Sequence, residues 1–126
     1  MSGSLDWSIH IVKVTGGSAF QPWVPNSHPG DPAKAQILDI VTWGNDTAEV
    51  HQPWPTENNT PNGVPAASNP PGSGLFFSEP IPPGGSSTPQ YVVPKALPSG
   101  TALGAGSVIY YCCKNHPTER GQIVIF

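Results

Sequence analysis

The chain has 126 residues, a formal net charge of -3 and 37% hydrophobic residues. This length and apolar content suit one core, so we expect a single domain over residues 1–126. The five basic residues form no cluster that could bind a phosphate backbone, and no apolar run approaches the roughly 20 residues that span a bilayer. The sequence therefore predicts neither a nucleic-acid partner nor a membrane span.

Short β-branched and aromatic runs alternate with clusters of turn residues, among them 14 Gly and 17 Pro. No long stretch keeps a helical period. This pattern is typical of all-β folds, in which short strands are joined by loops. We expect a Greek-key β-sandwich or barrel of six to eight strands with long Pro/Gly-rich loops.

The first expected strand is Leu5–Val14, in which Ile9 and Ile11 share one face, and it ends at Gly16. His10 lies in the middle of this strand, and we expect it to be structural. His28 lies among Pro, Asn and Gly residues that favour a solvated turn. The second expected strand, 35–43, is nearly continuous in apolar residues and is predicted to be central and buried.

Residues 55–74 are rich in Pro, Asn, Gly and Ser and show no periodicity, so they predict a long loop. Loops of this length are often functional, although a surface excursion pinned by Trp54 is equally compatible with the sequence. Three short strands are expected after it, at 75–77, 91–93 and 108–113. The last expected strand is 122–126.

Cys113 and His116 are three residues apart at the end of an expected strand. This spacing allows a thiolate and an imidazole to bind one ion, and the two ligand types together suit copper or zinc. Adjacent Cys112 and Cys113 cannot form an unstrained disulfide. Strand alternation places them on opposite faces, so Cys112 is expected to be a packing residue.

The run Cys113-x-x-His116-Pro117-x-x-x-Gly121-x-Ile-Val resembles the C-terminal motif of the cupredoxins, the blue or type 1 copper proteins, and most closely of their amicyanin and plastocyanin branch. Upstream, the run Asp-Ile-Val-Thr-Trp-Gly-Asn that leads to His51 resembles the family segment that supplies the first histidine ligand. The resemblance implies one copper ion, cycling between Cu(I) and Cu(II), bound by His51, Cys113 and His116.

The chain departs from this family at Glu119, where the family has its axial methionine; the only methionine of the chain is Met1. A carboxylate ligand would favour Cu(II) and lower the potential. Alternatively Glu119 faces solvent and leaves the axial position to water or a carbonyl, with Gln122 a third candidate. The family's asparagine after the first histidine is Gln52 here, so Asn45 is expected to take part of its bracing task.

The resemblance implies a one-electron carrier rather than an enzyme, located in the periplasm or otherwise outside the cytoplasm. The polar start Met-Ser-Gly-Ser lacks the apolar segment expected of a secretory leader, and removal of a leader would agree with this location. Redox partner proteins are expected to dock on a patch around Pro53, Trp54 and Pro117.

Other functions remain open. A copper enzyme or small-molecule sensor could use an open or carboxylate-bound axial site, and a zinc site could take Glu119 as fourth ligand. A copper-delivery or storage protein would be expected to carry methionine-rich or further histidine motifs, and the sequence has neither.

Overall fold

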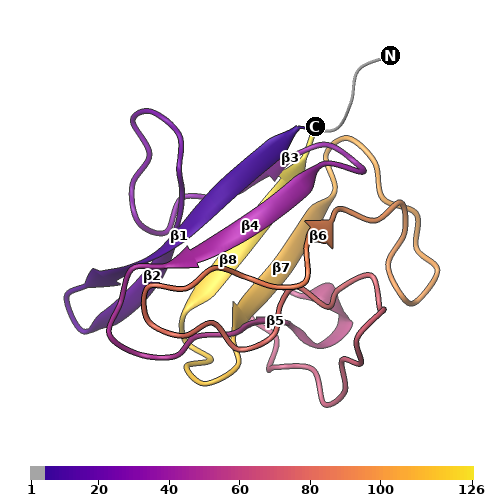
Figure 1. The fold of residues 1–126 in the computed structure, drawn as a ribbon. Helices are drawn as coiled ribbons and strands as arrows, with labels where there is room; N and C mark the ends of the chain where they lie inside the picture. Colours follow the sequence, from indigo (N-terminus) through magenta and orange to yellow (C-terminus); the bar gives the residue numbers. More distant parts are fainter. Residues whose placement is uncertain (1–4) are drawn as a thin grey trace.

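The computed structural model describes residues 5–126, which form eight strands in two four-stranded sheets (Figure 1). Met1 lies outside the described residues. The first sheet has the order β2-β1-β4-β6 and contains β1 (Asp6–Val14), β2 (Gly17–Pro22), β4 (Ile40–Asn45) and β6 (Tyr91–Val92). The second has the order β3-β8-β7-β5 and contains β3 (Ala33–Ala35), β5 (Pro53–Pro55), β7 (Val108–Cys113) and β8 (Arg120–Ile125). The predicted all-β sandwich is confirmed.

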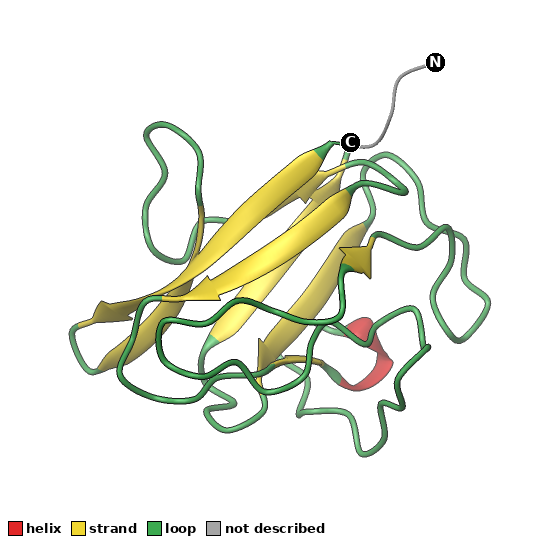
Figure 2. Cartoon of the chain, in the orientation of Figure 1, coloured by secondary structure: helices red, strands yellow, loops and turns green. Residues whose placement is uncertain are grey.

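Both sheets mix parallel and antiparallel pairs. β1 is antiparallel to β2 and parallel to β4, while β8 is antiparallel to β7 and parallel to β3. Long loops make up most of the remaining chain (Figure 2). Among the described residues, the one helical segment is the short 3-10 turn η1 (Glu57–Asn59). No helix of residues 5–126 is long and apolar enough to cross a membrane.

The core between the sheets is built around aromatic rings. Trp43 of β4 packs edge-on against Tyr111 of β7, and its indole N–H donates to the Tyr111 hydroxyl at 3.2 Å. The Tyr111 ring lies across β8 at Gly121, where a Cβ atom would come within 2.3 Å of it. Glycine in the closing motif is therefore required by this close approach, which joins the core to the loop that precedes β8.

The expectation of one buried strand over 35–43 was wrong. The chain makes β3, leaves the second sheet through a turn at residues 36–39, and enters the first sheet as β4. Leu38 adopts a positive φ of 72° and is 45% exposed. The Asp39 carboxylate holds this turn by accepting from the backbone N–H of Gln36 at 2.8 Å and from the Trp7 indole at 2.8 Å.

Two other boundaries differ from the predictions. Residues 75–77 are not a strand, although Phe77 is fully buried against Trp43 and so contributes to the core from a loop. Strand β5 was not expected because two of its three residues are proline, which cannot donate a ladder hydrogen bond. It lies at the edge of the second sheet, beside β7.

The predicted long loop over 55–74 is present, with η1 as its only helical or strand element apart from the end of β5. The indole N–H of Trp54 donates to the Ala66 carbonyl at 2.8 Å. This contact is the pinning by Trp54 that the sequence suggested.

Candidate metal centre

His51 lies on the connection between β4 and β5. The turn before it is shaped by Asn45, whose amide nitrogen donates to the carbonyls of Glu49 at 2.6 Å and Ile81 at 3.0 Å. His51 and Ile81 also exchange backbone hydrogen bonds of 3.2 and 2.7 Å. The histidine backbone is therefore fixed from both sides before any ligand binds.

Cys113 ends β7, and His116 and Glu119 follow on the loop to β8. Backbone hydrogen bonds close this loop on itself: His116 N–H donates to the Cys113 carbonyl at 3.1 Å, Glu119 N–H to that of His116 at 2.9 Å, and Cys113 N–H to that of Glu119 at 2.9 Å. Three side chains thus leave one compact turn on the same side.

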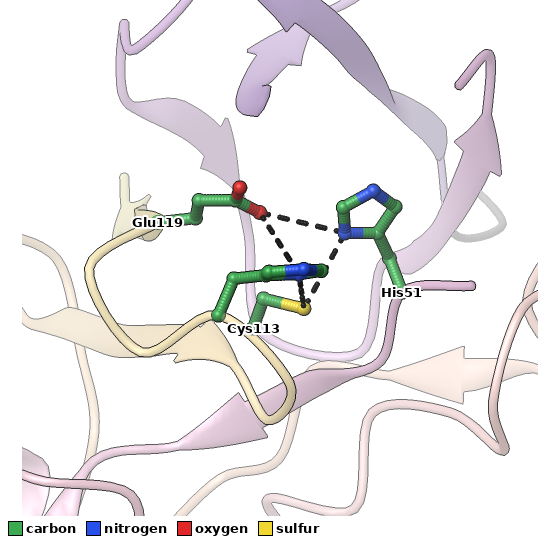
Figure 3. A group of neighbouring side chains, drawn as sticks. His51, Cys113 and Glu119 are labelled. Carbon is green, nitrogen blue, oxygen red and sulfur yellow. Dashed lines mark hydrogen bonds and ion pairs between the residues drawn. The ribbon is translucent and has the colours of Figure 1, made fainter. Parts of the chain in front are cut away.

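These four residues, which we call the metal centre, gather their side chains at one point (Figure 3). One ligand-type atom from each lies within 4.8 Å of the other three. The Cys113 sulfur lies 3.4 Å from His51 Nδ1 and 3.6 Å from His116 Nδ1. Glu119 Oε1 lies 3.4 Å from His51 Nδ1 and 3.7 Å from His116 Nδ1. The set of two imidazoles, a thiol and a carboxylate fits a mononuclear transition-metal site.

Burial divides the four residues into two pairs. His51 and Cys113 are 0% exposed, whereas the side chains of His116 and Glu119 are 33% and 11% exposed. Burial raises the pKa of the Cys113 thiol. Backbone N–H groups near the sulfur partly oppose this shift by lowering the pKa. Burial likewise lowers the pKa of His51, and the Glu119 charge opposes that shift. In the absence of metal the centre therefore favours a neutral thiol and a neutral inner imidazole.

Glu119 is held by the β1–β2 hairpin, far away in the sequence. The Ser18 backbone N–H donates to Glu119 Oε2 at 3.1 Å, and a Cβ atom on Gly17 would lie 3.3 Å from the same oxygen. Oε1, in contrast, is buried and has no hydrogen-bond partner. The carboxylate therefore offers one free oxygen to the centre and keeps the other on the hairpin. The Ser18 hydroxyl also lies 3.5 Å from His51 Nε2, the nitrogen that faces away from the sulfur.

Neither of the remaining histidines enters the centre. His10 stacks on Trp23 with ring centroids 3.9 Å apart, and its Nδ1 contacts the Asp46 carboxylate at 2.6 Å. His28 Nδ1 lies 3.6 Å from Asp31 in an exposed turn. His10 is thus a packed structural residue and His28 lies in a solvated turn, as the sequence predicted.

Three other expectations concern the surroundings of the centre. Gln122 lies within β8, where it pairs with Tyr110, and it is exposed. The Gln52 side chain donates to the Ser78 carbonyl at 3.0 Å, but its backbone carbonyl accepts from Lys114 N–H at 2.9 Å. The two ligand loops are thus joined through the Gln52 main chain, and Asn45 braces the His51 turn.

Of the three residues expected to form a docking patch, only Pro117 is exposed. Pro53 and Trp54 are buried, and the Lys114 ammonium lies 4.3 Å from the Trp54 ring centroid. Glu49 lies beside the outer edge of His116 instead, with its carboxylate 3.9 Å from His116 Nε2. Trp54 is therefore part of the support of the site and not of its surface.

Sequence reasoning did not identify the role of Gly17 and Ser18. The sequence predicts only that the first strand ends at Gly16, which does make a turn with a positive φ of 84°. The Ser18 contact with Glu119 joins residues 101 positions apart. A local motif carries no signal for such a contact.

Similar folds occur among copper proteins of known structure. A mutant of amicyanin in its Cu(I) form matches with 18% identity and a TM-score of 0.50, covering 100% of this chain and 85% of that one. A multicopper oxidase from Pseudomonas thermotolerans matches with 14% identity and a TM-score of 0.53, covering 99% of this chain and 30% of the oxidase. No family model matches the sequence, and neither does any curated protein. Together, the sandwich, the ligand-type group at one end of it and these neighbours identify the fold of the chain as that of the cupredoxins.

Proposed function

We propose that the chain is a single copper-binding domain that acts as a one-electron carrier, with His51, Cys113 and His116 as the main ligands of one ion. The observation that carries this proposal is the convergence of His51 Nδ1 and His116 Nδ1 on the Cys113 sulfur, at 3.4 and 3.6 Å. Two imidazoles and one thiolate are the equatorial donors of blue-copper electron-transfer sites. A bound copper ion would supply the Cu(II)/Cu(I) couple.

Zinc would accept the same four donors, because it favours tetrahedral sites of nitrogen, sulfur and oxygen. The fold favours copper, because similar folds occur among copper proteins. Ser18 holds Oε2 of Glu119, so the carboxylate would reach either metal through one oxygen only.

We propose that Glu119 is an axial ligand of the copper ion and that it lowers the reduction potential of the site. Its unpartnered Oε1 is buried beside both imidazoles, which is costly for a carboxylate unless a cation completes the site. A hard, charged oxygen stabilises Cu(II) more than a thioether does. We therefore expect a reduction potential below that of the same site with methionine.

The residues of the centre suit electron transfer through small rearrangements. The backbone hydrogen bonds of the Cys113 loop and the His51–Ile81 pair fix three ligands in place. The partly exposed His116 edge, with Pro117 beside it, offers the shortest route to a partner protein. We propose that redox partners dock there and that the protein works outside the cytoplasm.

The absorption and EPR spectra of the Cu(II)-loaded protein test this proposal. We expect an intense visible thiolate-to-copper band that is lost in Cys113→Ser and retained in Cys112→Ser, the matched control on the opposite face of β7. Loss of the band in Cys112→Ser alone would contradict the ligand assignment. Tight binding of zinc with no visible band from copper would contradict the electron-carrier function.

A copper enzyme or small-molecule sensor would require access to the axial position. We propose that Glu119 would fill that position, because Oε1 lies 3.4 Å from His51 Nδ1 and 3.7 Å from His116 Nδ1, so we expect azide or nitric oxide to leave the Cu(II) spectrum unchanged. A new band or altered EPR signal at saturating azide would support the sensor or enzyme instead.

A further inference from the structure

A second site lies away from the metal centre, between the long loop after β5 and the segment 97–101. These two segments enclose a groove of about 640 Å³, which we call the loop groove. Pro55, Thr56 and Asn69 line one side of it, and Leu97 and Thr101 line the other. Its volume lies within the range of small-molecule sites, about 300 to 1,000 Å³. Electron transfer at the metal centre does not require this groove.

Two buried polar groups of the groove have no hydrogen-bond partner. Thr56 is 2% exposed and Asn69 is 8% exposed, yet no protein atom of residues 5–126 bonds Thr56 Oγ1 or Asn69 Nδ2. Buried polar groups without partners cost free energy and are uncommon in proteins. Both residues line the groove, so a rotation of either side chain would bring its unpartnered atom to a ligand there.

The walls of the groove are fixed by contacts made outside it. Asn59 donates from Nδ2 to the Val108 carbonyl at 2.9 Å, and its Oδ1 accepts from Tyr110 N–H at 2.8 Å, which attaches η1 to β7. Inside the groove, the Ser73 hydroxyl donates to Asn69 Oδ1 at 2.8 Å. This bond fixes the carbonyl side of the Asn69 amide, while Nδ2 stays buried in the wall of the groove.

The lining determines the chemistry of the ligand. Among the described residues, the groove is lined only by Pro, Leu, Ala, Ser, Thr and Asn, with no charged side chain and no aromatic ring. An ion would lose its hydration there without a counter-charge. A molecule with aliphatic carbons and several hydroxyls would match both the apolar lining and the polar groups. We propose that the loop groove binds a small neutral polyol, with the size of one or two sugar rings, through Thr56 and Asn69.

Titration of the 15N-labelled protein by NMR tests this proposal. The probes are glycerol, glucose and trehalose, together with glucuronate as a charged counterpart of glucose. We expect saturable amide shifts confined to residues of the groove with at least one neutral sugar, and none with glucuronate. Absence of saturable shifts with every neutral probe at millimolar concentration would mean that only solvent fills the groove, and it would overturn the proposal. Equal binding of glucuronate would overturn it as well.

Two variants establish which atoms bind. Thr56→Val keeps the shape of the side chain and removes the hydroxyl, and Asn69→Asp removes the amide donor while keeping an acceptor for Ser73. Each is expected to weaken binding about threefold to tenfold, the usual range for one hydrogen bond. Thr42→Val, in the other sheet, is the matched control and should not change it. Unchanged affinity in both groove variants would contradict the assigned contacts.

Discussion

The metal centre and the loop groove both bury polar atoms that no protein atom satisfies, but their surroundings carry very different charge. In the metal centre, Glu119 Oε1 lies among two imidazoles and a thiol. In the loop groove, Thr56 Oγ1 and Asn69 Nδ2 lie among uncharged residues only. Among residues 5–126 these are the only buried side-chain atoms of this kind. Our proposals of a cation for one site and a neutral molecule for the other rest on this difference.

The two sites differ as well in what a substitution can remove. The metal centre is held by backbone hydrogen bonds within the Cys113 loop and by the hairpin that contains Ser18. The loop groove is also held by backbone hydrogen bonds, such as that from Leu97 N–H to the Thr101 carbonyl, and by the Asn59 side chain on β7. A substitution in the metal centre would remove a donor to an ion, whereas one in the groove would remove a single neutral hydrogen bond, so we expect larger effects in the metal centre.

The largest expected effect is loss of a histidine ligand. His51→Ala should lower the copper affinity more than about 100-fold, because even residues that only orient a ligand are worth 10- to 100-fold. His10→Ala is the matched control, since His10 contacts Asp46 and Trp23 and not the centre. Competition against a chromophoric chelator measures both. A similar loss in the two variants would mean that the affinity reflects general stability and not ligation.

The local motifs predicted three members of this centre because their geometry is set locally. Cys113 and His116 lie in one short turn, and His51 follows the strand that ends at Asn45. Glu119 was a predicted candidate, but its orientation was not predictable, since it depends on Ser18 across the sandwich. The loop groove was not predictable either, because its two sides meet only in the folded chain.

The sequence predicted strands in which buried and exposed residues alternate. It did not predict the point at which the chain passes from one sheet to the other. In β1, Ile9 and Ile11 share one face as expected, and both are buried. The apolar run over 35–43 resembled one strand because the hydrophobic pattern carries no information on backbone angles, and the positive φ of Leu38 interrupts the strand. The apolar and aromatic side chains of residues 75–77 favoured a strand, yet Phe77 packs into the core from a loop.

The second largest effect is expected at the axial position. Glu119→Met replaces a charged oxygen with a soft, neutral sulfur and should raise the reduction potential by more than about 59 mV, which corresponds to a tenfold change in equilibrium. Glu119→Gln keeps the size and removes the charge, so it should raise the potential in the same direction. Protein-film voltammetry measures both variants. Little change in either, with unaltered spectra, would show that Glu119 is not a ligand.

A smaller effect is expected from the hairpin that holds Glu119. Gly17→Ala would place a Cβ atom 3.3 Å from Oε2 and should displace the carboxylate by a few tenths of an ångström. The EPR parameters of the Cu(II) protein should change, with a potential shift smaller than that of Glu119→Met. Gly104→Ala is the matched control, because nothing lies within 4 Å of a Cβ atom there. Identical spectra for the two variants would contradict the positioning role of the hairpin.

The smallest expected effect concerns the groove in the free protein. Thr56→Val replaces a buried hydroxyl without a partner by a methyl group of similar shape, so the free energy of unfolding should rise by about 1 kcal/mol. Thr47→Val should instead lower the free energy of unfolding. The Thr47 hydroxyl donates to Asn45 Oδ1 at 2.7 Å, and the substitution removes this hydrogen bond. Denaturant unfolding of the metal-free protein measures the difference. If Thr56→Val destabilises the protein as much as Thr47→Val does, the Thr56 hydroxyl is already satisfied by ordered solvent, and the groove is then matched to water in the way that the metal centre is matched to a cation.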